Sequence, residues 1–203
     1  MLVSTTRVGA VGAAITPAKE RVLQVAEKLF MERGYTAVTM RDIADSLGMK
    51  QASLYNHAPD GKEQLFVEVV ERNLEKHKEG MRAAIAGAAS DLRAQLQAAA
   101  RWLLSQPPMN VARITRSDMP EIAPDKVLHI SGMVFQALLA PIERAFTTAQ
   151  ANGVIRAIDP KFLSGMFVVA VESLHEVPRY SNRSMDALID DTVGLFLDGV
   201  LIS

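Results

Sequence analysis

The polar side chains of residues 39–57 have the types and spacing needed to contact a nucleic acid. The amide of Gln51 can form two hydrogen bonds with an adenine edge. The hydroxyl of Tyr55 and the imidazole of His57 can bind phosphate oxygens. Lys50 adds a positive charge, and the stretch around it holds no acid. These groups point to DNA contact in preference to catalysis.

Two short helices joined by a tight turn would place these side chains on one surface. Thr39 begins the first helix as its N-cap, and Asp42 completes a capping box. Gly48 permits the sharp turn that follows. The other helix is expected over about 50–57, and because it is too short to stand alone it must pack through Leu54. The pattern predicts a helix-turn-helix, whose second helix fits the DNA major groove.

A further helix precedes this pair. Thr16 and Pro17 form a favoured combination of N-cap and first-turn residue. Apolar residues then recur at spacings of three and four, namely Val22, Val25, Ala26, Leu29 and Phe30. They form one stripe on which the two short helices can pack. A three-helix head is therefore expected over residues 16–62.

The composition indicates a globular protein. The chain has 203 residues, 49% of them hydrophobic, enough for one or two domains with a sizeable core. The absence of cysteine rules out disulfides, thiolate metal sites and cysteine nucleophiles. No run of about 18 apolar residues predicts a membrane span. Residues 1–15 are interpreted as a flexible arm and not as a signal peptide, so a cytoplasmic protein is expected.

The charge balance gives no general preference for nucleic acid. The net charge is −1, and residues 16–65 contain seven basic and seven acidic side chains. Whether the head can bind nucleic acid therefore depends on where each charge lies. The acids gather on the first helix and at Asp42 and Asp45, away from Lys50. A neutral head can bind DNA when its few cations face the phosphates, although long-range attraction is weak.

The rest of the chain is also typical of helices, so the fold class is all-α. Residues with high helix propensity dominate, and helices are expected over about 61–80, 90–105, 125–151, 160–176 and 185–201, with a short one over 109–118. Pro141 should kink the third of these long helices, over 125–151, because proline has no N–H to donate to the carbonyl of Ala137.

The last two helices are apolar around most of their circumference. A helix of this kind must be buried on most sides, and a terminal helix is rarely buried by its own chain alone. The pattern predicts a homodimer joined through a four-helix bundle; the alternative is an internal core. The expected interface residues are Met166, Val169, Ala170, Leu188, Val193, Phe196 and Val200.

The N-terminal segment resembles the tetracycline-repressor (TetR) family of bacterial regulators. The residues that carry the likeness are Ala26 to Gly34, Tyr35, Thr39 to Gly48, Ser53-Leu54-Tyr55, His57 and Lys62-Glu63-Gln64-Leu65. The resemblance implies that two heads grip successive major grooves of a near-palindromic operator. It also implies that a small ligand moves the long helix after the head and ends repression.

The resemblance divides the chain into an arm over 1–15, a DNA-binding domain over 16–62 and an effector-binding and dimerisation domain over 63–203. The sequence departs from the family pattern at Ala58, where many relatives carry an aromatic residue, and in a linker, 59–61, that is one residue longer than usual. Lys50 stands at an N-cap where Ser or Thr is common. Lysine cannot cap, at a cost of about 0.5–2 kcal/mol, so either it contacts DNA or the head is less ordered until DNA binds.

Nine residues are assigned to double-stranded DNA, and the prediction is sequence-selective binding. Gln51 is the candidate for reading a base, and Ala52 and Ser53 can meet a thymine methyl or a phosphate. Arg41, Tyr55, His57 and Lys62 are candidates for phosphate contacts that fix the register. The alternatives are a solvated pair of Arg41 with Asp45 and structural packing of the two rings. The full set is Thr39, Arg41, Lys50, Gln51, Ala52, Ser53, Tyr55, His57 and Lys62.

An effector site is expected among the methionine and aromatic residues of the middle helices. These residues favour an apolar small molecule, with His129 as a polar contact; the alternative is that they form plain core. The candidates are Trp102, Met109, Met119, His129, Met133, Phe135, Phe146, Met166 and Phe167.

Enzyme motifs are not found. There is no glycine-rich phosphate loop, no His-Glu-x-x-His and no nucleophile elbow, and Glu172, His175 and Glu176 offer only isolated pairs. No cofactor or metal is expected. The function predicted is a ligand-responsive transcriptional repressor. The alternatives are a helical ligand-binding protein or enzyme whose head no longer binds DNA, and a nucleoid-type protein with an unspecific head.

Overall fold

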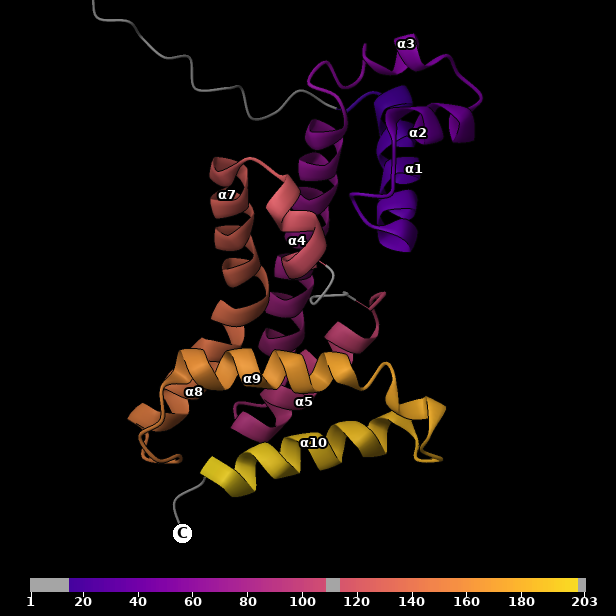
Figure 1. Cartoon of the computed structure of the whole chain (residues 1–203). Helices are drawn as coiled ribbons and strands as arrows, with labels where there is room; N and C mark the ends of the chain where they lie inside the picture. The colour runs from indigo at the N-terminus through magenta and orange to yellow at the C-terminus, as the bar shows by residue number, and fades with distance from the viewer. Residues whose placement is uncertain (1–14, 109–113, 201–203) are drawn as a thin grey trace, which may run out of the picture. The chain divides into compact units, whose positions relative to one another are not determined.

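The protein is described by a computed structural model over residues 15–108 and 114–200 (Figure 1). The described residues form helices and contain no β-strand, which confirms the predicted all-α class. The chain divides into two compact units, Met1–Val69 and Val70–Ser203. The boundary falls inside one long helix, α4 (Lys62–Gly87).

The N-terminal unit packs three helices and the first turns of α4 around one core. The helices are α1 (Pro17–Arg33), α2 (Met40–Leu47) and α3 (Gln51–Leu54). Thr16 caps α1, and its hydroxyl accepts a hydrogen bond from the backbone N–H of Lys19 at 3.2 Å, as predicted. Val22, Ile43, Leu54 and Leu65 are fully buried. Three rings close the core: Phe66 packs against Phe30 and Tyr35 with centroid distances of 5.3 and 4.9 Å.

The described residues of the C-terminal unit form five α-helices besides the remainder of α4. They are α5 (Leu92–Leu104), α7 (Pro124–Val134), α8 (Ala140–Ala151), α9 (Pro160–Ser173) and α10 (Met185–Val200). Short helical turns lie between them: η1 (Ile114–Asp118), η2 (Met119–Glu121), η3 (Phe135–Leu139) and η4 (Val177–Arg179). The core holds Leu103, Ile142, Phe146, Phe167 and Val193, all with no exposed surface.

The helix predicted over 125–151 is interrupted where proline requires it. A π-helical turn, η3, separates α7 from α8, and the N–H of Ala140 bonds to the carbonyl of Phe135. Pro141 follows directly and cannot donate to the carbonyl four residues earlier. The wider π-helical turn takes up this missing bond.

Polar contacts join α5 to α10 in the C-terminal unit. Gln97 Nε2 donates to Asp190 Oδ1 at 2.7 Å, and Arg101 Nε lies 3.2 Å from Asp186 Oδ1. Figure 1 shows α9 and α10 as the last two long helices of this unit, beside α5. No described helix is long and apolar enough to cross a membrane.

Candidate nucleic-acid interface

The turn between α2 and α3 is fixed by local sequence. The Thr39 hydroxyl accepts from the N–H of Asp42 at 3.1 Å, and the Asp42 carboxylate accepts from the N–H of Thr39 at 2.8 Å. This is the predicted capping box. The Asp42 carboxylate also accepts a hydrogen bond from the Thr39 hydroxyl at 2.5 Å. This bond, followed by the one from the Thr39 backbone N–H, lowers the pKa of Asp42. Gly48 ends α2 at φ +66°, a left-handed conformation that glycine adopts without strain.

Helix α3 presents a polar face to solvent, and one apolar residue anchors it to the core of the head. Gln51, Ala52 and Ser53 are exposed, whereas Leu54 is fully buried. The helix is shorter than the predicted 50–57. Residues 55–58 continue as turns, in which His57 and Ala58 both donate to the carbonyl of Leu54, at 2.9 and 3.1 Å. The break at 59–61 stops these turns from extending into a regular helix.

Two cations flank the exposed face. Lys50 is the N-cap residue of α3, and its side chain makes no capping hydrogen bond, as expected. It is exposed. Arg41 on α2 is 80% exposed and lies 3.8 Å from Asp45. A pair this exposed contributes at most about 1 kcal/mol, so Arg41 remains available to a phosphate.

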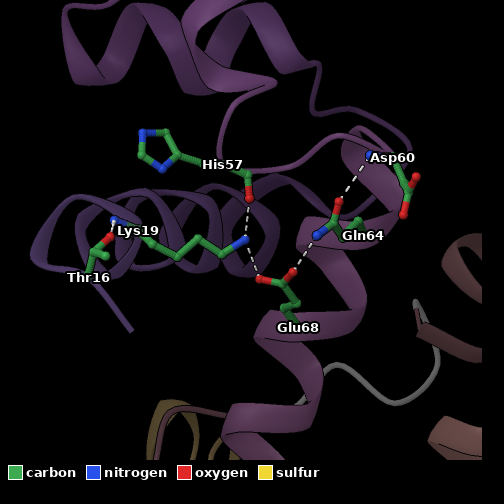
Figure 2. Close-up of polar contacts among 6 residues, drawn as sticks. All are labelled: Thr16, Lys19, His57, Asp60, Gln64 and Glu68. Carbon is green, nitrogen blue, oxygen red and sulfur yellow. Dashed lines mark hydrogen bonds and ion pairs between the residues drawn. The ribbon is translucent and has the colours of Figure 1, made fainter. Parts of the chain in front are cut away.

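Tyr55 and His57 lie on the turns that follow α3. The Tyr55 ring is 42% exposed, and His57 is half-buried. The backbone carbonyl of His57 accepts a hydrogen bond from Lys19 Nζ at 2.5 Å, so the ring itself is not used in this contact (Figure 2). Ala58 is fully buried, so the small side chain at this family departure fits inside the head.

Lys62 has a contact inside the head that the sequence did not indicate. Its ammonium donates to the carbonyl of Tyr35 at 3.0 Å and lies 4.0 Å from the centroid of the Tyr35 ring. This joins the start of α4 to the loop between α1 and α2. A phosphate contact by Lys62 stays a prediction, and it would have to share the ammonium with this structural contact.

The residues predicted to bind an effector differ in their burial and surroundings. His129 and Met133 line an open groove of about 670 Å³ together with Leu74, Lys78 and Gln136. Phe146 and Phe167 are fully buried core residues, and Met166 is 48% exposed. Met119 and Phe135 are half-buried, and Met109 lies outside the described residues.

Trp102 meets a partner that the sequence prediction missed. Its ring lies edge-on to His77 of α4 with centroids 6.4 Å apart. Trp102 Nε1 and His77 Nδ1 are buried with no hydrogen-bond partner. Burial lowers the pKa of His77, and the nearby Lys76 charge lowers it further. The available signal was spacing, because His77 stands three residues after Leu74 and four before Met81 on the inner face of α4.

One of the residues that line the groove, His129, makes a polar contact with α4. His129 Nε2 lies 2.7 Å from Glu71 Oε1, so His129 joins α7 to α4 within the C-terminal unit.

Among the described residues, no cluster of three or more histidine or acidic side chains is placed to hold a metal ion.

The residues predicted for a dimer interface fall into two groups. Met166 and Val169 are 48% and 59% exposed on α9. Leu188, Val193 and Val200 are buried inside their own protomer. They face the core because α10 packs on α5 and α9, so they offer little surface to a partner. Ala170 is half-buried, as is Phe196, which packs against Phe167 at 5.3 Å.

Two apolar residues of α9 and α10 outside the predicted set are also exposed. Phe162 on α9 is 58% exposed, and Leu195 on α10 is 77% exposed. Phe162, Met166 and Val169 recur at spacings of four and three, so they share one side of α9. We refer to these three residues as the α9 stripe.

The comparisons with known proteins agree with this geometry. Residues 22–69 match the family model of bacterial regulatory proteins, tetR family. A segment of 52 residues, 26% of the chain, is 46% identical to the HTH-type transcriptional repressor KstR2 of Mycolicibacterium smegmatis and covers 25% of it. The match thus spans about a quarter of the length of this curated relative.

Solved structures extend the likeness to the whole fold. A regulatory protein in the tetR family from Rhodococcus RHA1 is 20% identical with a TM-score of 0.71, over 93% of this chain and 99% of that chain. AibR, solved in complex with isovaleryl coenzyme A and operator DNA, is 24% identical with a TM-score of 0.69, over 87% and 96%.

A capped α2, a left-handed turn at Gly48 and an exposed α3 define a helix-turn-helix protein. The head of this chain matches the tetR family model, and solved structures of tetR-family regulators share the fold of the chain.

Proposed function

We propose that this protein is a transcriptional repressor that binds a near-palindromic operator as a homodimer and is released by a small molecule. One observation carries the proposal. The exposed face of α3 holds Lys50, Gln51, Ala52 and Ser53 with no acid among them, and Leu54 fixes it to the core from the other side. A face of this kind is suited to the major groove.

In this proposal the contacts divide by role. The Gln51 amide reads a base edge, most simply adenine. Thr39, Arg41, Lys50 and Tyr55 bind phosphates and set the register of the head on the duplex. The neutral charge balance of the head means that these few contacts supply the salt-dependent part of the affinity.

The α9 stripe supports dimerisation. Three neighbouring apolar side chains, each about half exposed, are unusual on a surface that water covers. Pairing two copies through this face would bury the stripes and supply two heads, as a two-fold symmetric operator requires.

The contact between His77 and Trp102 supports an effector site in the C-terminal unit. Buried polar atoms are nearly always hydrogen-bonded in folded proteins. Trp102 Nε1 is only a donor, whereas Nδ1 of a neutral His77 can donate or accept, and burial favours the neutral form. A hydroxyl group on an otherwise apolar molecule, which accepts and donates, suits both atoms. His77 lies on α4, the helix that also contributes Lys62–Val69 to the head.

The test of DNA binding is selection of binding sites from random duplexes. A palindrome should be enriched, and Gln51→Ala should change the preferred base at one position per half-site, at a cost of about 1–3 kcal/mol on the best site. Gln24→Ala, an exposed change on α1, is the control and should leave the preference unchanged. If no sequence is enriched, the repressor proposal fails.

The test of the effector site uses the single tryptophan of the chain. Small molecules are screened in parallel for release of the selected operator and for a change in Trp102 fluorescence. Compounds that release DNA should change the emission, and Trp102→Phe should weaken their effect. A compound that releases DNA without changing the emission would place the effector elsewhere. No enzymatic activity is included in the proposal, and a protein of this function works where the DNA is, in the cytoplasm.

A further inference from the structure

The Lys19 side chain connects three segments of the head. From α1, its ammonium donates to the carbonyl of His57 at 2.5 Å and pairs with Glu68 Oε2 of α4 at 2.5 Å (Figure 2). The side chains of Lys19 and Glu68 are only 18% and 28% exposed. Charge-assisted contacts this sheltered from water are stronger than surface pairs.

The contact continues along α4 to the other end of the same turn. Gln64 Nε2 donates to Glu68 Oε1 at 2.7 Å, and Gln64 Oε1 accepts from the N–H of Asp60 at 3.0 Å. Glu68 therefore uses both of its carboxylate oxygens. The turn over residues 57–60 is held at its first residue from α1 and at its last from α4, as Figure 2 shows.

This arrangement compensates for the weakness of α3. The helix has four residues, too few to be stable alone, and its N-cap lysine makes no capping bond. The buried Leu54 at its end and the bonds to the turn that follows it help to fix its position.

We propose that Lys19 and Glu68 are positioning residues for operator binding. Their contact sets where the recognition segment, residues 51–57, lies relative to α1 and α4, although neither side chain touches DNA. The inference rests on the proposed DNA-binding function and names the residues that make the DNA-binding surface rigid. The expected consequence is a loss of sequence selectivity when the contact is broken.

Glu68→Gln distinguishes a positioning role from a simple charge effect, because the two predict opposite changes in operator affinity. Removing a negative charge from a DNA-binding head should tighten DNA binding if only charge matters. The positioning role predicts the opposite. An amide accepts at one atom only, so either Lys19 or Gln64 loses its acceptor. We expect affinity for the selected operator to fall about tenfold, while Glu27→Gln on α1 serves as the control with the same change of charge.

Lys19→Met separates positioning from phosphate binding. Because the ammonium is already held by Glu68 and the His57 carbonyl, its loss should weaken operator binding without changing the slope of affinity against salt. Lys50→Met should instead reduce that slope by about one phosphate contact. Lys28→Met, on an exposed lysine 4.0 Å from Glu32, is the control for removing a lysine from α1.

Partial unfolding is distinguished by comparing specific with non-specific binding. A lower folded fraction would weaken both by the same factor, whereas a displaced recognition segment loses mainly specific affinity. Lys19→Arg, which keeps the charge and the donors, should restore selectivity. The double variant Lys19→Met/Glu68→Gln should bind about as weakly as either single variant, because the two residues act as a unit.

The outcomes separate this inference from the proposed function. If the wild-type protein enriches no operator, the proposed function fails. If it does, and Glu68→Gln binds that operator as tightly as the wild type or more tightly, the positioning role is overturned. An unchanged ratio of specific to non-specific affinity in Lys19→Met would overturn it as well.

Discussion

At the scale of single residues, Lys50 occupies the N-cap position of α3 without capping it. Its position at the start of α3 favours a side chain that accepts a hydrogen bond from the backbone, which lysine cannot do. The same position leaves the ammonium exposed at the edge of the recognition face. A cation here is useful only when a phosphate or a base is near.

Lys50→Ser should therefore change stability and DNA binding in opposite directions. The serine hydroxyl can cap α3, which should raise the free energy of unfolding by about 1 kcal/mol. The loss of the cation should lower operator affinity and reduce its salt dependence. Urea unfolding and binding measured across salt concentrations check the two effects, and a variant that is more stable with unaltered salt dependence would remove Lys50 from the DNA contacts.

His77 predicts a pH dependence of stability. Burial holds the pKa of His77 below its usual value of 6.5, so the unfolded chain binds more protons than the folded one just below pH 6.5. Stability from this group is complete above that pH and is lost as the pH falls through the lower folded pKa. In urea unfolding measured from pH 8 to pH 5, the free energy of unfolding of His77→Phe should fall less with decreasing pH than that of the wild type. Equal pH profiles for the two proteins would contradict this.

At the scale of elements, α4 and α5 approach closely because α4 has a glycine, Gly80, at the point of contact. A Cβ placed on Gly80 would lie 1.9 Å from Trp102 Cζ2. Trp102 thus lies directly against the backbone of α4, which also positions the ring beside His77. The helix propensity of Gly80 is poor, and this close contact explains the presence of a glycine here.

Gly80→Ala should destabilise the C-terminal unit even though alanine is the better helix former. The indole has to move, and overpacking of this kind costs about 1–3 kcal/mol. Gly132→Ala in α7 is the matched control, because nothing lies within 4 Å of its Cβ, and it should stabilise by about 0.5–1 kcal/mol. Calorimetric unfolding measures the change in stability of the two variants. If Gly80 had room for a methyl group, both substitutions would stabilise the protein.

At the scale of the whole molecule, the surface of the last helices sets the expected assembly. The apolar residues of α10 are mostly used inside the protomer, whereas the α9 stripe and Leu195 remain outside. An interface is therefore expected to centre on α9, with α10 contributing a smaller share than its sequence suggests.

Val169→Glu should convert the dimer to a monomer. A carboxylate in the middle of the α9 stripe would face a copy of itself across a two-fold axis, unpaired and removed from water. Light scattering should show a mass of about 22.1 kDa in place of twice that value. Leu128→Glu, on a residue 76% exposed on α7, is the control and should stay dimeric. If Val169→Glu stays dimeric, the α9 stripe is not the interface.

The local features of the head were predictable because each depends on residues close in sequence. The capping box of Thr39 and Asp42, the turn at Gly48 and the uncapped Lys50 all lie within a few residues of their partners. The interruption near Pro141 is equally local, since it follows from one missing N–H. The helix-turn-helix and the all-α fold could therefore be predicted from the sequence alone.

The tertiary structure alone decided which side chains meet across long separations. Lys19 and the His57 carbonyl are 38 residues apart, and Lys62 bonds to Tyr35 across 27. A pattern of types at helical spacing shows that a face is apolar, but not whether the same chain or a partner covers it. For this reason the sequence alone could not separate Val193, in the core, from Val169, on the surface. Periodicity is a property of one helix, whereas burial depends on every helix that packs around it.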